Sequence, residues 1–162
     1  MARLVNLEEA ARLASGWRGQ GKKLVLANGC FDLLHVGHVR YLQAARLLGD
    51  ALLVALNSDA SVRRLKGPGR PIMTAAERAE LVGALAGVDA VLVFDEDCAD
   101  ALIARLRPDI HAKGTDYTEE SVPERASVLA AGGRVAIAGD LKQHATADVI
   151  RTVLDRFGGP IQ

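Results

Sequence analysis

The chain has 162 residues, of which 49% are hydrophobic and 25% are charged, a composition typical of a globular protein with one packed core. Its 20 basic and 20 acidic side chains balance, so no overall charge favours a nucleic acid or a membrane surface as a partner. The two cysteines are too few for a disulfide scaffold. The N-terminus has no apolar segment typical of a signal peptide, and no apolar run is long enough to span a membrane, so a cytoplasmic protein is expected.

Along the chain, segments with apolar residues at helical spacing alternate with short, continuous apolar runs. The helical spacing predicts helices over residues 7–17, 36–48, 74–85, 99–106, 119–131 and 146–157. The apolar runs predict strands over residues 24–27, 51–56, 90–94, 109–112 and 134–138. Residues 57–59 are expected to form a turn and a helix cap, and residues 63–71, which are rich in Gly and Pro, a loop.

This alternation predicts an α/β fold, a Rossmann-like doubly wound five-stranded parallel sheet with helices on both faces. Because no internal repeat or long linker divides the chain, a single domain is expected over residues 1–162. It comprises an N-terminal helix and lead-in at 1–22 and the α/β core at 23–157. Ligands of such sheets bind beyond the carboxyl ends of the strands, so polar residues that follow strands are candidate site residues.

A polar turn, residues 29–38 (GCFDLLHVGH), follows the first predicted strand directly. His35 and His38 are three residues apart at the start of a predicted helix, so their side chains share a face. Gly37 lets a phosphate approach the backbone, and the helix N-terminus offers free N–H groups and partial positive charge. Two incidental surface histidines are the alternative, but their place directly after a strand favours a site that stabilises charge on a phosphoryl group.

This turn resembles the His-x-Gly-His motif of a nucleotidyltransferase superfamily that includes cytidylyltransferases and adenylyltransferases. Residues 57–67, 69–72, 77–78 and 113–118 (KGTDYT) are similar to the heptose 1-phosphate adenylyltransferase branch, which carries a Lys-Gly-Gly-Asp-Tyr signature. The resemblance covers nearly the whole chain. Since only three residues precede Leu4, the standalone form without a fused sugar-kinase domain is expected.

The resemblance implies that AMP passes from ATP to a heptose 1-phosphate, giving pyrophosphate and ADP-heptose for a lipopolysaccharide core or a related glycoconjugate. Members of the superfamily form no covalent intermediate, so Cys30 is not expected to be a nucleophile. Mg²⁺ is expected to offset charge on the triphosphate, with Asp32 nearby and the ligands unassigned. The expected partners are these small molecules and a second copy of the chain, as a homodimer.

Cations and polar side chains that follow the predicted strands complete the expected site. Lys66 alone reads as a solvated lysine, but its Gly- and Pro-rich loop after the second strand favours contact with the triphosphate. The expected catalytic residues are His35, His38 and Lys66. The expected nucleotide-binding residues are Cys30, Phe31, His35, Gly37, His38, Asn57, Asp59, Lys66, Arg70 and Thr146. The expected substrate-binding residues are Asn28, Gly29, Asp32, Lys113, Gly114, Asp116 and Tyr117.

Three assignments stay open at the level of sequence. Arg78 either contacts phosphate or pairs with Glu77 or Glu80 across a helical turn. Thr146 either binds phosphate or caps the last helix. The polar stretch at 113–117 is either part of the site or an ordinary loop.

Two segments depart from the family pattern. Residues 86–90 (AGVDA) stand where cytidylyltransferases carry Arg-Tyr-Val-Asp-Glu, a segment associated with the cytosine nucleotide, so the resemblance favours ATP over CTP. Residues 145–147 (ATA) replace Ser-Thr-Thr at the opening of the last helix, where the backbone N–H groups remain but one hydroxyl is left.

Two other functions therefore remain as alternatives. A cytidylyltransferase that acts on a small alcohol phosphate, such as glycerol 3-phosphate, shares the histidine motif but not the loop at 113–117. A nucleotide-binding sensor without catalysis is supported by the altered segment at 145–147 alone.

Overall fold

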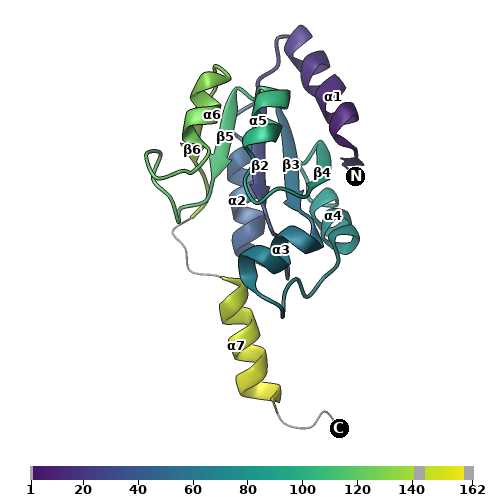
Figure 1. Ribbon diagram of the computed structural model, residues 1–162, viewed down its shortest axis with the longest axis vertical. Helices are drawn as coiled ribbons and strands as arrows, with labels where there is room; N and C mark the ends of the chain where they lie inside the picture. The colour runs from purple at the N-terminus through teal and green to yellow at the C-terminus, as the bar shows by residue number, and fades with distance from the viewer. Residues whose placement is uncertain (1, 141–144, 159–162) are drawn as a thin grey trace.

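The structure, a computed structural model, describes residues 2–140 and 145–158. These residues form a parallel sheet of six strands in the order β1-β4-β3-β2-β5-β6 (Figure 1). The strands are β1 (Arg3–Leu4), β2 (Leu24–Gly29), β3 (Ala51–Asn57), β4 (Ala90–Phe94), β5 (Ile110–Lys113) and β6 (Arg134–Ile137).

The Rossmann-like α/β fold is confirmed, but the prediction of five strands was wrong by one. The additional strand, β1, spans two residues at the edge of the sheet, beside β4. The backbone N–H of Val5, just after it, donates to the carbonyl oxygen of Val91. A segment this short shows no alternation of apolar and polar residues, so no sequence pattern indicated it.

Helices cover both faces of the sheet, as the sequence predicted. Along β2, Leu24 and Leu26 face one side and Val25 and Ala27 face the other, because successive side chains of a strand alternate. Apolar residues of α1 (Leu7–Gly19), α5 (Asp100–Leu106) and α6 (Arg125–Ala130) pack on the first face. Those of α2 (Val36–Arg46) and α4 (Ala75–Gly83) pack on the second face.

One helix was not predicted, and another begins later than predicted. The helix α3 (Asp59–Lys66) occupies the expected turn and the start of the expected loop, because Ser58 caps it by accepting the N–H of Ser61. The helix ends at Gly67, whose φ of 96° suits glycine. The helix α6 begins later than residue 119, since Pro123 disfavours a helical conformation at the residue before it.

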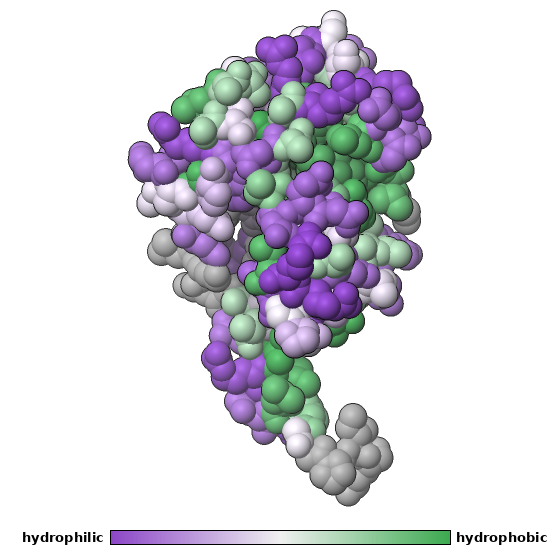
Figure 2. All heavy atoms as spheres, in the orientation of Figure 1, coloured by the Kyte–Doolittle hydropathy of each residue, from purple (hydrophilic) through white to green (hydrophobic). Residues whose placement is uncertain are grey.

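The last helix, α7 (Thr146–Phe157), extends away from the sheet, and none of its residues is buried (Figure 1). Its apolar side chains gather on one face (Figure 2), where Val149, Val153, Leu154 and Phe157 are exposed. The Thr146 hydroxyl at its start donates to the backbone oxygen of Asp32 at 2.7 Å. None of the described helices is long and apolar enough to span a membrane.

The strand order creates a switch point beside β2. From β2 the chain runs outward to β3 and β4, and it then returns to form β5 on the other side of β2. The helix α2, which follows β2, and the helix α6, which follows β5, therefore lie on opposite faces of the sheet. Such a divergence opens a crevice beyond the carboxyl ends of the two strands, where ligands of doubly wound sheets bind.

Candidate active site

A cavity of about 720 Å³ lies at this switch point. Its volume falls in the range of sites that hold nucleotides and other small ligands. All of the predicted site residues line it except Asp59. The sequence prediction missed several other lining residues, among them Arg40, Tyr41, Asp97, Cys98, Thr115, Glu124, Gly139 and Asp140.

The turn between β2 and α2 is tightly constrained. Phe31 and Leu33 have φ angles of 49° and 48°, a left-handed conformation that costs a non-glycine residue about 1 kcal/mol or more. A side chain at Gly29 would lie 3.1 Å from the buried ring of Phe31. Gly29 therefore fits closely within the turn, and it also lines the cavity, where the sequence suggested a contact with substrate.

His35 and His38 lie side by side at the N-terminus of α2, with their ring centroids 3.8 Å apart. The backbone N–H of His35 donates to Nδ1 of His38 at 3.4 Å, so the proton of a neutral His38 ring is on Nε2. Burial, and then the neighbouring His35, lowers the pKa of His38 to about 4. His38 is thus a neutral hydrogen-bond donor at neutral pH and contributes no full positive charge.

Asp32 lines the cavity, but its carboxylate is used by the protein. It accepts the N–H groups of Ile72 and Met73 at 2.9 and 3.0 Å and pairs with the guanidinium of Arg70. Burial would raise the pKa of Asp32, but these hydrogen bonds hold it below its usual value. The carboxylate of Asp32 therefore orders the loop after α3. The backbone carbonyl oxygen of the same residue accepts the hydrogen bond from Thr146 at the start of α7.

The expected proximity of Mg²⁺ to Asp32 does not fit this arrangement, because both carboxylate oxygens already accept hydrogen bonds from the loop. Within residues 2–140 and 145–158, no group of three or more His, Cys, Asp and Glu side chains could hold a metal ion. A metal bound here would therefore depend on ligands that the nucleotide brings.

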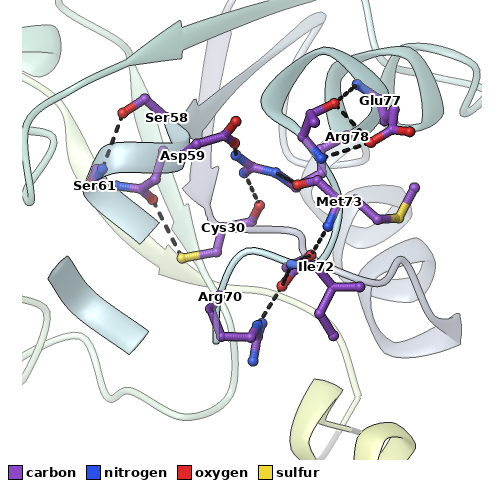
Figure 3. Close-up of polar contacts among 12 residues, drawn as sticks. Cys30, Ser58, Asp59, Ser61, Arg70, Ile72, Met73, Glu77 and Arg78 are labelled. Atoms are coloured by element: carbon purple, nitrogen blue, oxygen red, sulfur yellow. Dashed lines mark hydrogen bonds and ion pairs between the residues drawn. The ribbon is translucent and has the colours of Figure 1, made fainter. Parts of the chain in front are cut away.

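Arg78, whose role was open, is fully buried beneath the turn. Its guanidinium donates to the carbonyl oxygens of Cys30 and Met73 and to the carboxylate of Asp59 at 2.8 Å (Figure 3). Arg78 thus ties three segments together and does not line the cavity. Asp59, predicted to bind nucleotide, is oriented toward Arg78 and does not line the cavity.

The segment that follows β3 brings two cations to the cavity, of which Arg70 is already paired with Asp32. Lys66, the exposed last residue of α3, and Arg70 both line it. Burial raises the pKa of the Cys30 thiol although Lys66, Arg78 and Arg70 act against it, so the thiol stays protonated. A protonated thiol is a weak nucleophile, which agrees with the expectation that Cys30 is not one.

Two helix N-termini face the same cavity. The first residues of α2 and of α7 line it, and Ala145, which precedes α7, has no side-chain acceptor to cap that helix. Backbone N–H groups at both ends can therefore bind phosphate oxygens. The departure from Ser-Thr-Thr at 145–147 removes hydroxyls from the site but leaves this property intact.

The opposite wall consists of buried polar side chains on β2, β5 and the N-terminus of α6. Lys113 forms an ion pair with Glu124, and Asn28 lies against both residues. Glu124 had no local sequence signal, since its partner Asn28 is 96 residues away in the chain. Tyr41, whose hydroxyl donates to the carbonyl oxygen of Ala112 at 2.7 Å, was missed for the same reason.

Residues 86–90, whose sequence favoured ATP over CTP, connect α4 to the start of β4. They lie at the amino ends of the strands, and none of them lines the cavity. Val88 is buried in the core and Asp89 accepts the N–H of Leu52. The choice of base therefore rests on the resemblance of the other segments and gains no support from this one.

The fold, and the turn after β2 that carries the two histidines, are those of a Rossmann-like nucleotidyltransferase. Residues 26–146 match the cytidylyltransferase-like family, and the chain belongs to that family.

Bifunctional HldE proteins are close in sequence. That of Syntrophotalea carbinolica is 54% identical over 140 residues, which cover 86% of this chain and 29% of that protein. That of Methylobacillus flagellatus is 48% identical over 149 residues, which cover 92% of this chain and 30% of that protein. The chain therefore spans about 30% of the length of these relatives.

Two solved structures share the fold. The lipopolysaccharide core biosynthesis protein from Thermoplasma volcanium GSS1 has a TM-score of 0.65 and 27% identity, with 75% of this chain and 100% of that chain covered. A pantoate-beta-alanine ligase from Francisella tularensis, complexed with beta-gamma ATP and beta-alanine, has a TM-score of 0.61 at 12% identity. That match covers 88% of this chain and 69% of the ligase and shows a common fold alone.

Proposed function

We propose that this chain transfers AMP from ATP to a heptose 1-phosphate, giving ADP-heptose and pyrophosphate. The observation that carries the proposal is the cavity at the switch point, where two histidines and two helix N-termini face a polar wall. The similarity to HldE proteins and to a lipopolysaccharide core biosynthesis protein supports the sugar acceptor and a role in heptose-containing glycoconjugates.

In the proposed reaction, an oxygen of the sugar phosphate attacks the α-phosphorus of ATP in line. The bond from the α-phosphorus to the bridging oxygen breaks, and pyrophosphate leaves with the electron pair. Because the attacking phosphate is already anionic, no strong general base is needed. His38 donates from Nε2 to a phosphate oxygen, while Lys66 and the N-termini of α2 and α7 hold the triphosphate.

The nucleotide is proposed to enter as its magnesium complex. Mg²⁺ usually keeps several waters and binds through substrate phosphates together with few protein ligands. This arrangement suits a cavity whose nearest carboxylate, Asp32, is already saturated by hydrogen bonds. The metal would supply charge neutralisation for the departing pyrophosphate.

A homodimer and a cytoplasmic location belong to the same proposal. They rest on the composition and on the family resemblance described above. Sedimentation of the purified chain tests the first of them, with a mass of twice 17.2 kDa expected for the dimer.

A substrate screen tests the proposed function. Pyrophosphate release is measured with ATP and with CTP, each in the presence of heptose 1-phosphate or glycerol 3-phosphate. Release is expected with ATP and heptose 1-phosphate. Faster release with CTP and glycerol 3-phosphate would instead identify a cytidylyltransferase, and tight ATP binding without release on either acceptor would indicate a sensor.

A further inference from the structure

Lys113 is a buried cation whose hydrogen-bond donors are used inside the protein. Its Nζ lies 3.1 Å from Oδ1 of Asn28 and 3.2 Å from both carboxylate oxygens of Glu124. It also lies 5.2 Å from the ring centroid of Tyr117. An ammonium group has three donors, so these contacts leave Lys113 little capacity to bind a phosphate.

The partners of Asn28 fix the direction of its amide. Lysine can only donate, so the atom of Asn28 that faces Lys113 must be the oxygen. Nε2 of His111 lies 3.0 Å from the same oxygen and must therefore carry a proton. The amide nitrogen is left with a long contact of 3.5 Å to Oε1 of Glu124, and Asn28 lines the cavity. The second N–H of this amide is thus available to a ligand.

The groups behind Asn28 hold this arrangement firmly. His111 is fully buried, and burial, followed by the charge of Lys113, lowers its pKa to about 4, which keeps the ring neutral. Burial would raise the pKa of Glu124, but Lys113 holds it below its usual value, so the carboxylate stays charged. The donor and acceptor roles in this cluster are therefore the same across the neutral pH range.

The charges divide the cavity into two halves. At the end of α3, after β3, Lys66 is exposed and lines the cavity. On the β5 side, the positive charge of Lys113 is neutralised by Glu124. A highly charged triphosphate therefore belongs beside Lys66 and the N-termini of α2 and α7, and a polyhydroxylated sugar phosphate belongs beside Asn28.

We propose that Lys113, together with Glu124 and His111, is a positioning residue that aims the amide nitrogen of Asn28 at an oxygen of the sugar phosphate. Lys113 then acts through Asn28, in place of the direct substrate contact that the sequence suggested. The inference rests on the proposed function, because it assigns the acceptor to this wall of the cavity.

A double-mutant cycle between Lys113 and Asn28 tests the proposal. Lys113→Met and Asn28→Ala are each expected to raise the KM for heptose 1-phosphate about tenfold and to leave the KM for ATP nearly unchanged. If Lys113 acts through Asn28, the double variant has the KM of Asn28→Ala alone. If the rises in the KM for heptose 1-phosphate multiply in the double variant, Lys113 acts independently of Asn28 and the proposal is overturned. An equal rise in the KM for ATP would also overturn it, because the effect would then not be confined to the sugar phosphate.

A second pair of variants separates positioning from folding. Lys113→Met and Glu124→Gln each leave one buried charge unpaired and are expected to lower the melting temperature. The two changes combined remove both charges, so the melting temperature is expected to recover while the KM for heptose 1-phosphate stays raised. Recovery of both properties would show that the pair is merely structural. Ser127→Ala is the control. The Ser127 hydroxyl on α6 donates to the carboxylate of Asp100, and Ser127 does not line the cavity.

The tautomer of His111 gives a test that does not depend on the reaction. In ¹H–¹⁵N spectra of the whole chain, the proton of the neutral ring is expected on Nε2, bound to the Asn28 oxygen. A proton on Nδ1 would mean that the Asn28 amide faces the other way and would overturn the proposal. If this spectrum agrees while the wild-type chain releases no pyrophosphate with heptose 1-phosphate, the proposed function fails and the positioning of Asn28 stands.

Discussion

His38 contributes to the proposed transition state as a neutral donor and not as a cation. Its Nδ1 accepts a hydrogen bond from the backbone of His35, which leaves the proton on Nε2 for a phosphate oxygen. Charge that develops on the phosphoryl group during transfer would strengthen this hydrogen bond in the transition state more than in the bound substrate. The residue is therefore expected to act mainly on turnover.

The variant His38→Ala is expected to lower kcat about 100-fold and to change the KM for ATP much less. The reason is that the lost hydrogen bond strengthens in the transition state. His38→Gln, whose amide can donate from a similar place, is the matched variant and is expected to keep more of the turnover. Steady-state kinetics decides, and a loss confined to the KM would contradict the transition-state role.

The sequence predicted those cavity residues that belong to local patterns. His35 and His38 are three residues apart in one turn, and both line the cavity. Glu124 was not predicted, because its contacts with Lys113 and Asn28 depend on how β2, β5 and α6 come together. Asp32 and Asp59 were predicted as ligand contacts, whereas the structure shows both carboxylates bound to arginines.

Among the secondary-structure elements, the connections around the cavity depend on two buried charged residues. Asp32 holds the loop between α3 and α4 through Arg70, Ile72 and Met73, and its carbonyl oxygen holds the start of α7. Arg78 joins the start of α3 to the histidine turn and to the start of α4 (Figure 3). These segments come from distant parts of the chain, so the geometry of the cavity depends on these bonds.

The variant Arg78→Lys is expected to destabilise the chain by about 3 kcal/mol, because lysine cannot reach three acceptors and leaves buried oxygens unpaired. Urea-induced unfolding measures this change. Arg64→Lys is the matched control, since Arg64 pairs with Asp97 at the surface, where ion pairs contribute little. Equal stability of the two variants would contradict the buried role of Arg78.

Element boundaries were predicted where a strong local signal exists. Thr74 and Glu77, three residues apart, form a capping box at the start of α4, and both of its hydrogen bonds are present. The helix α3 was missed because the Gly- and Pro-rich stretch from residue 63 was read as a loop, although a turn and cap were expected at residues 57–59 and Val62 is buried. The short edge strand β1 depends on pairing with β4, which no local pattern records.

For the whole molecule, the alternation of strands and helices predicted the doubly wound sheet and the edge at which ligands bind. The order of the strands followed only from the structure, which places β5 beside β2 and thereby opens the cavity between α2 and α6. The same arrangement keeps two histidines neutral, the half-buried His38 and the buried His111, and this has a consequence for stability.

The free energy of unfolding is expected to fall as the pH is lowered from 7 to 5. The pKa of both histidines is about 4 in the folded chain, against about 6.5 when unfolded, so the unfolded chain binds more protons between these values. Each histidine then lowers the free energy of unfolding by up to about 2 kcal/mol at pH 5. Urea unfolding at both pH values measures the loss, and His38→Gln is expected to reduce it. A stability that does not change with pH would contradict the burial of neutral histidines.

The central claim is that the α-phosphate of ATP moves to the sugar phosphate in this cavity. The direct measurement follows radiolabel from ATP in the presence of heptose 1-phosphate, with His38→Ala as the control. Label in the α-phosphate is expected in the sugar nucleotide and label in the γ-phosphate in pyrophosphate, both about 100-fold slower in the variant. Transfer of the γ-label to the sugar, or α-label that remains in unreacted ATP, would contradict the account.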